Sequence, residues 1–103
     1  MGYDFNKNGL NPWEFVGACA VCGFTPAEMH HVIYGTANRA KSDKYGFVIP
    51  LCRHHHIEIH SKPNQGLDLH WKQEAQTYFE QHYGNRTDFI REFGRSWKGE
   101  NDE

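Results

Sequence analysis

Two short metal-type motifs with the same spacing constrain this chain more than any other feature. Cys19 and Cys22 are separated by two residues, and further along the chain Cys52 and His55 have the same gap. Two thiolates at this spacing can bind one ion from a tight turn, and a later Cys and His can complete the tetrahedral set that structural zinc prefers. The sequence therefore predicts a structural zinc site formed by these four residues.

The size of the chain gives a physical reason for such a site. It has 103 residues, of which 38% are hydrophobic, and a small domain buries a smaller fraction of its surface than a large one. Disulfides, metals or oligomerisation usually supply the missing stability. Three cysteines are an odd number, which argues against a purely disulfide framework and favours metal binding in a reducing cytoplasm. Two alternatives remain: His54 replaces His55, or Cys52 is a buried core thiol and the first pair is incidental.

Charge and hydropathy exclude two classes of protein. The formal net charge is −2, which is not the strongly basic balance of a protein that coats nucleic acid. No apolar run is long enough to span a membrane, and the first residues do not have the pattern of a signal peptide. We therefore expect a cytoplasmic protein that is not attached to a membrane.

The middle of the chain has the order strand, loop, strand and helix. A strand is expected within residues 28–34, followed by a polar, basic loop over 35–46. A second strand is expected over 47–51, where Pro50 marks an edge strand or the end of the strand. No helix breaker occurs over 53–59, so this segment is expected to be helical.

The C-terminal third has helical periodicity. Apolar residues recur at helical spacing over residues 68–83, which predicts an amphipathic helix that Gly84 ends. Thr87 is expected to cap a shorter helix that runs to residue 93. Asn11-Pro12 has the pattern of a further helix start. The expected organisation is one domain over residues 1–103, with a core at about 19–60 and a helical extension at about 67–97. Aromatic residues of the longer helix can stack on bases but are assigned to the core, namely Trp71, Tyr78 and Phe79.

Histidines form a second pattern that overlaps the first. His56 and His60 are four residues apart, so on a helix they project from one face and can chelate one divalent ion. His30 and His31 are adjacent, and neighbouring side chains of a strand point to opposite faces. One of the two can therefore bind the metal while the other faces water, and imidazole is a suitable general base because its pKa lies near neutrality. The alternatives are surface histidines gathered by chance, or additional zinc ligands.

Together these motifs resemble those of the HNH (ββα-metal) endonucleases, and in particular small phage proteins of that type, including the phage RecA-dependent nuclease group. The resemblance covers about residues 19–60 and rests on Cys19, Cys22, Glu28-Met29-His30-His31-Val32, Gly35, Asn38-Arg39, Tyr45-Gly46 and the run from Val48 to His60. It implies an α+β fold with a small ββα-metal, treble-clef-like core held together by zinc and followed by C-terminal helices.

The resemblance also implies roles for individual residues. His31 would be the general base, and His30 and His56 would bind the catalytic divalent ion, with His60 as a third ligand. The cofactors would be structural Zn²⁺ at Cys19, Cys22, Cys52 and His55, and catalytic Mg²⁺, Mn²⁺ or another divalent ion. The family has an Asn before its second strand, where this chain has Tyr45-Gly46-Phe47. Asn38 is the candidate for that catalytic role, and Asp43 is a possible substitute.

The function that follows is a metal-dependent endonuclease, encoded by a phage, that hydrolyses DNA phosphodiester bonds in the host cytoplasm. Basic residues that flank the proposed site are candidate phosphate contacts, unless they are ordinary solvated charges: Arg39, Lys41, Lys44 and Arg53. Expected partners are DNA and a phage or host protein of recombination or packaging. The alternative is a catalytically inactive zinc-bearing module that binds DNA or a protein partner.

Overall fold

The computed structural model describes residues 18–35 and 37–98. The helix start expected at Asn11-Pro12 lies outside the described residues. Over these described residues the chain forms an α+β fold with a two-stranded sheet and four helices. In chain order the elements are β1 (Glu28–His31), α1 (Asn38–Tyr45), β2 (Val48–Leu51), α2 (Arg53–Ser61), α3 (Gly66–His82) and α4 (Arg86–Phe93).

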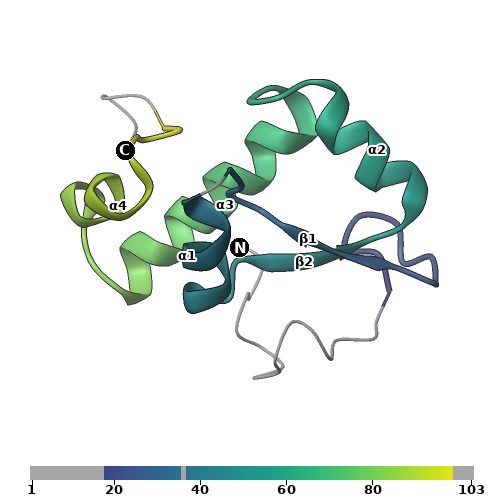
Figure 1. The fold of residues 1–103 in the computed structure, drawn as a ribbon, viewed down its shortest axis with the longest axis horizontal. Helices are drawn as coiled ribbons and strands as arrows, with labels where there is room; N and C mark the ends of the chain where they lie inside the picture. Colours follow the sequence, from purple (N-terminus) through teal and green to yellow (C-terminus); the bar gives the residue numbers. More distant parts are fainter. Residues whose placement is uncertain (1–17, 36, 99–103) are drawn as a thin grey trace.

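The sheet is an antiparallel hairpin that carries the paired histidines. Its register pairs Glu28 with Leu51, Met29 with Pro50, His30 with Ile49 and His31 with Val48. Both strands are edges, so Pro50 is accommodated as expected, and its carbonyl accepts a hydrogen bond of 2.7 Å from the backbone N–H of Ala20. Figure 1 shows α2 and α3 on one side of the hairpin, with α1 and α4 towards its other end.

The segment expected to be a loop over 35–46 instead contains α1. The helix ends at Gly46, whose φ of 78° lies in the left-handed region and whose N–H bonds back to carbonyls of the last turn. Only Ser42 is buried on this helix, and its hydroxyl donates to the carbonyl of Ile33 (2.6 Å) and accepts from the N–H of the same residue (3.2 Å). The prediction was wrong because a helix that docks through a serine has no apolar stripe.

The two C-terminal helices lie close to the expected positions, but the cap of α4 differs. The N-cap is Asn85 rather than Thr87, and it forms a capping box with Asp88. A Cβ at Gly84 would lie 2.6 Å from Oδ2 of Asp88, so glycine lets the capping carboxylate approach closely. Gly94 ends α4 in the left-handed region at φ 91°.

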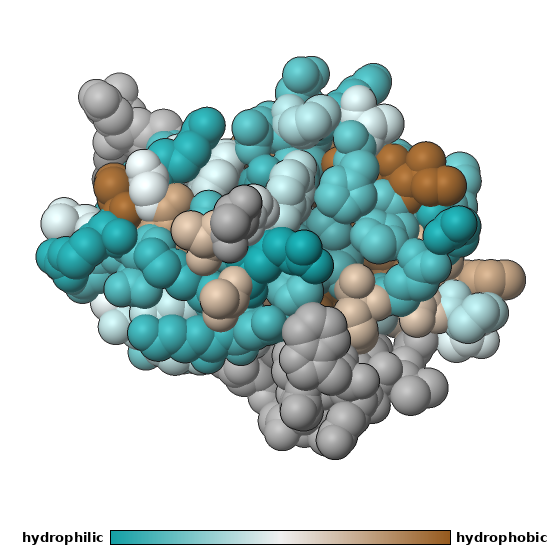
Figure 2. Space-filling view, in the orientation of Figure 1, coloured by the Kyte–Doolittle hydropathy of each residue, from teal (hydrophilic) through white to brown (hydrophobic). Residues whose placement is uncertain are grey.

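The apolar core joins the hairpin to the C-terminal helices. One cluster of buried residues extends from Cys19 to Trp97, and it includes Phe47, Ile49 and Leu51 from the second strand region. Trp71 and Phe79 of α3 are buried in it and Tyr78 packs against it, which confirms their assignment to the core. Among the described residues, no helix combines the length and the apolar character needed to span a membrane. Figure 2 shows a largely hydrophilic face with small hydrophobic spots.

Candidate metal centres

Three thiols and one imidazole converge where α2 begins. Cys19 and Cys22 lie in the turn before β1, Cys52 precedes α2, and His55 is in the first turn of that helix. The sulfurs of Cys22 and Cys52 are 3.8 Å apart, and Nδ1 of His55 is 3.6 Å from the Cys19 sulfur and 3.3 Å from the Cys52 sulfur. Tetrahedral ligands of zinc are expected about 3.3 to 3.8 Å apart. The cluster can therefore hold a metal such as zinc.

Backbone hydrogen bonds shape this turn for thiolate ligands. The N–H of Gly23 donates to the carbonyl of Cys19 (2.8 Å), and the N–H of Val21 donates to the Cys19 sulfur (3.4 Å). Burial raises the pKa of the Cys19 thiol, but the backbone N–H groups of Cys52, Cys22 and Val21 lower it, to about 6 overall. A thiol of this kind is largely ionised at neutral pH, which is the form that binds metal.

His54, the alternative ligand, is directed elsewhere. Its side chain is 80% exposed and lies 3.8 Å from the carboxylate of Glu58. The imidazole of His55, in contrast, lies among the three sulfurs. The geometry therefore selects His55, as the equal spacing of the two motifs predicts.

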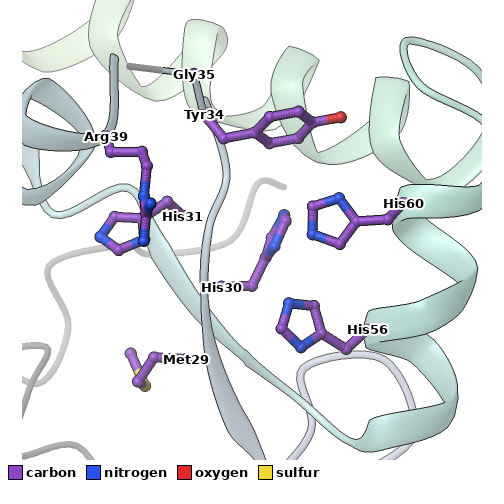
Figure 3. Close-up of a pocket in the computed structure, with 8 residues that line it drawn as sticks. All are labelled: Met29, His30, His31, Tyr34, Gly35, Arg39, His56 and His60. Carbon is purple, nitrogen blue, oxygen red and sulfur yellow. The ribbon is translucent and has the colours of Figure 1, made fainter. Parts of the chain in front are cut away.

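A second cluster consists of three imidazoles from two elements. His30 comes from β1, and His56 and His60 come from one face of α2. Ring centroids are 5.3 Å apart for His30 and His56, 5.1 Å for His30 and His60, and 5.2 Å for His56 and His60. One nitrogen from each ring lies within 4.8 Å of the others, so the three can hold one ion. Figure 3 shows the rings turned toward one another.

His30 has the protonation state that a metal ligand needs. It is 3% exposed, and within the described part of the chain its Nε2 has no hydrogen-bond partner. Burial, followed by the nearby charges of His60, His56, His31 and Lys72, lowers the pKa of His30 to about 3. The ring is therefore neutral at physiological pH, with an unused buried nitrogen. Burial and the charge of His56 also lower the pKa of His60. These residues fit a divalent cation that prefers nitrogen ligands.

Glu28 orients one of these ligands and was missed in the sequence. Its Oε1 accepts a hydrogen bond of 2.7 Å from Nδ1 of His56, and its Oε2 accepts one of 3.2 Å from Arg53. The hydrogen bond from His56 is the main reason that the pKa of Glu28 is lowered. A carboxylate on one nitrogen fixes the tautomer and leaves the other nitrogen for a metal. The residue could have been identified because positions i and i+2 of a strand share a face, and Glu28 is two residues before His30.

His31 faces α1 instead of the cluster. Its Nε2 lies 2.8 Å from Oδ1 of Asp43, and the residue is 8% exposed. Adjacent residues of β1 therefore serve different neighbours, as the alternation of a strand predicts. The partner is Asp43, the substitute considered from the sequence. Asn38 begins α1, where its N–H donates to the carbonyl of Gly35 (3.2 Å).

Both histidine environments border one cavity of about 500 Å³. Its lining residues, drawn in Figure 3, are Met29, His30, His31, Tyr34, Gly35, Arg39, His56 and His60. Tyr34 was also missed, because its place depends on contacts with α3 that no local pattern reveals. Figure 3 shows Arg39 and His31 on one side of the β1 backbone and the three-histidine cluster on the other.

The four candidate phosphate contacts have different surroundings. Arg39 lines the cavity, and Arg53 lines a shallower neighbouring pocket of about 370 Å³ with His56 and His60. Lys41 donates a hydrogen bond to the carbonyl of Glu92, and thus ties α1 to α4. Lys44 lies 5.2 Å from the centre of the Tyr45 ring. Only the two arginines therefore border the histidine sites.

Comparison with known proteins finds a matching protein family. Residues 11–96 match the family described as "Protein of unknown function (DUF968)". The chain is also 30% identical over 88 residues to "Uncharacterized protein YdfU" of Escherichia coli (strain K12). This match covers 84% of the chain and 22% of the relative, so the chain spans about a fifth of the length of that protein. No solved structure matches the chain significantly.

Proposed function

This chain belongs to the DUF968 family of proteins of unknown function, and we propose that it is a metal-dependent endonuclease of the HNH (ββα-metal) type that hydrolyses DNA. One observation carries the proposal. The adjacent residues His30 and His31 border one cavity from two environments, a three-imidazole cluster and an imidazole held by a carboxylate. A protein that needs zinc only for folding would use the cysteine cluster and leave this second arrangement without a role.

The proposed ββα-metal core consists of β1, β2 and α2. The strand supplies His30, and the helix supplies His56 and His60 across the cavity. The cysteine cluster lies at the start of the same helix, so zinc bound there would fix α2 against the hairpin. The structural ion would thereby set the distance between the ligands of the catalytic ion.

The proposed catalytic ion is one that prefers nitrogen ligands. The cluster offers three imidazoles and no carboxylate, whereas Mg²⁺ prefers oxygen ligands and usually keeps several waters. Co²⁺, Ni²⁺ or Zn²⁺ therefore suits the site better than Mg²⁺ or Mn²⁺, which both favour oxygen ligands. A divalent ion held by these residues would stabilise the negative charge that develops on the phosphate and the leaving oxygen.

His31 acts as general base in this proposal. Its Nε2–H donates to Asp43, so Nδ1 carries the lone pair that accepts a proton from the attacking water. Asp43 fixes the tautomer and stabilises the imidazolium that forms, which is the part played by the orienting carboxylate of a catalytic triad. Asp43 thus takes the part that the resemblance gave to the family's Asn.

Arg39 supplies the positive charge for the substrate phosphate. It lines the cavity beside His31, and a guanidinium can donate two parallel hydrogen bonds to phosphate oxygens. Arg53 is a second candidate at the neighbouring pocket, where it also pairs with Glu28. These contacts position DNA without reading its sequence.

Nicking of a supercoiled plasmid tests the activity. The parent protein is assayed with Mn²⁺, Ni²⁺, Co²⁺ and Mg²⁺, beside His30→Ala and the matched control His54→Ala, whose histidine is exposed outside both proposed sites. We expect metal-dependent nicking by the parent and by the control, and its loss in His30→Ala. A parent protein that binds DNA but does not cut it with any of these ions would contradict the proposal and favour the inactive binding module.

A further inference from the structure

A buried ion pair on α3 has no part in the proposed chemistry. Asp68 is 1% exposed and Lys72 is 4% exposed, and the ammonium of Lys72 lies 2.9 Å from Oδ2 of Asp68. Moving two charges out of water costs free energy that their mutual attraction often only offsets. Stabilisation of the fold alone therefore does not explain this buried pair.

The pair organises the turn that follows α2. Oδ2 of Asp68 accepts hydrogen bonds from the backbone N–H of Asn64 (2.6 Å) and from the hydroxyl of Tyr34 (3.3 Å). The side-chain oxygen of Asn64 accepts from Lys72 (2.8 Å) and from the indole N–H of Trp97 (2.9 Å). Asn64 has a left-handed φ of 61°, a conformation that asparagine adopts more readily than most residues other than glycine. The turn after α2 is therefore attached to α3 through the buried side chains of Asp68 and Lys72.

Tyr34 connects this network to the histidine cluster. The ammonium of Lys72 lies 4.3 Å from the centre of the Tyr34 ring. The centre of this ring is 5.1 Å from the centre of the His60 ring and 5.9 Å from the centre of the His30 ring. Figure 3 shows the Tyr34 ring beside His60, with its hydroxyl directed out of the cluster. The ring is thus held by a cation and a carboxylate of α3 and lies against two of the three proposed ligands.

His60 is the ligand that most needs such support. It is the last but one residue of α2, where a helix frays most readily. His56 has a carboxylate partner in Glu28, whereas the contacts described for the His60 ring are with the rings of His30, His56 and Tyr34. Tyr34 is therefore a group outside the cluster that can fix the orientation of the His60 ring.

We propose that Tyr34 is a positioning residue for the three-histidine metal site and that the Asp68–Lys72 pair of α3 holds it there. The inference rests on the proposed metal site, and it deepens that proposal by making α3 part of the site. Hydrogen-bonded partners of metal ligands typically change metal affinity by about 10- to 100-fold, and for a packing contact such as that of Tyr34 we expect the lower end of this range. The effect is expected on the histidine site and not on the cysteine cluster.

Co²⁺ binding tests this directly. Each protein is first loaded with one equivalent of Zn²⁺, which fills the cysteine cluster, and is then titrated with Co²⁺. The visible absorption of bound Co²⁺ reports its coordination geometry. Co²⁺ bound by the histidines should lack the charge-transfer bands that thiolate ligands produce. Tyr34→Phe removes one hydroxyl, and Asp68→Asn removes the carboxylate charge. The control is Gln76→Met, because Gln76 is a buried polar residue of the same helix that bonds to Ser96 and Trp97 and not to Tyr34.

We expect Tyr34→Phe to weaken Co²⁺ binding about 10-fold and to alter the absorption spectrum, while Gln76→Met lowers thermal stability and keeps parental affinity. Parental affinity and spectrum in Tyr34→Phe, or an equal loss in Gln76→Met, would overturn the proposal. Tyr34→Phe decides alone if Asp68→Asn does not fold. A parent that binds no ion beyond zinc overturns both proposals, whereas Co²⁺ binding without DNA cleavage overturns the nuclease alone.

Discussion

The imidazole of His31 and the carboxylate of Asp43 form a hydrogen bond of 2.8 Å between β1 and α1. Asp43 lies within residues 35–46, a segment that the sequence predicts to be a loop. The helix that replaces that loop brings Asp43 to His31, and the dyad therefore exists only because α1 folds. This pairing leads to the first prediction.

Asp43→Ala is expected to lower the single-turnover cleavage rate by about 10- to 100-fold, since the general base loses its orienting partner. DNA affinity and metal content should stay at parental values, because Asp43 lies outside both metal clusters. The control is Asn38→Ala, at the start of the same helix. A larger loss in Asn38→Ala than in Asp43→Ala would return the orienting role to Asn38.

Zinc removal is expected to unfold the protein. A structural Zn²⁺ site contributes about 10 kcal/mol or more to the folding of small domains, which exceeds what a small core supplies. Elemental analysis should find one tightly bound zinc, and circular dichroism should show loss of helix after chelation. His55→Ala should release this zinc and His54→Ala should retain it. Complete folding after chelation would contradict the assignment.

The neutral state of His30 predicts loss of stability in acid. The pKa of His30 is lowered from 6.5 to about 3 in the folded chain, so the unfolded chain binds one more proton between these values. Stability is therefore present above about pH 6.5 and is lost as the pH falls towards 3. Between pH 7 and 5.5 this residue should account for about 1 kcal/mol of lost unfolding free energy.

Urea unfolding of the zinc-loaded parent and of His30→Leu at the two pH values measures this contribution. The difference between the two proteins isolates His30 from the other titrating groups. The parent should lose more stability than the variant between the two pH values. An equal pH dependence would mean that His30 does not stay neutral in the fold.

Substitutions of two basic residues of α1 should have different effects, one on DNA affinity and the other on thermal stability. Arg39→Ala is expected to weaken DNA binding and to reduce the salt dependence of affinity by about one phosphate contact. Lys41→Met is expected to lower the melting temperature with little change in affinity, because Lys41 bonds to the carbonyl of Glu92. Fluorescence anisotropy over a salt series and thermal unfolding measure the two effects. Weaker DNA binding by Lys41→Met, with an unchanged melting temperature, would show that Lys41 contacts DNA.

The sequence was most informative where local spacing alone brings residues together. The two metal-type motifs predict the cysteine cluster, and the four-residue spacing on α2 predicts that His56 and His60 share a face. The opposite directions of His30 and His31 follow from strand alternation. These features need no knowledge of distant contacts.

The remaining features depend on tertiary packing. The polar helix α1 docks through Ser42 and has no apolar stripe, so the helix was not expected, and the sequence offered Asp43 only as a substitute for Asn38. Asn85 rather than Thr87 caps α4, because the carboxylate of Asp88 completes the capping box. The place of Tyr34 depends on Asp68 and Lys72 of α3, which lie far from it in sequence.

The central claim is that His31 is the base that activates water, and the single-turnover cleavage rate of His31→Ala tests it most directly. Parent, His31→Ala and the control His54→Ala are compared at saturating DNA and Ni²⁺, with bound metal measured in each. We expect the cleavage rate of His31→Ala to be about 100- to 10,000-fold lower than that of the parent, with metal content and DNA affinity unchanged. The control should cleave at the parental rate. A parental rate in His31→Ala would contradict the central claim.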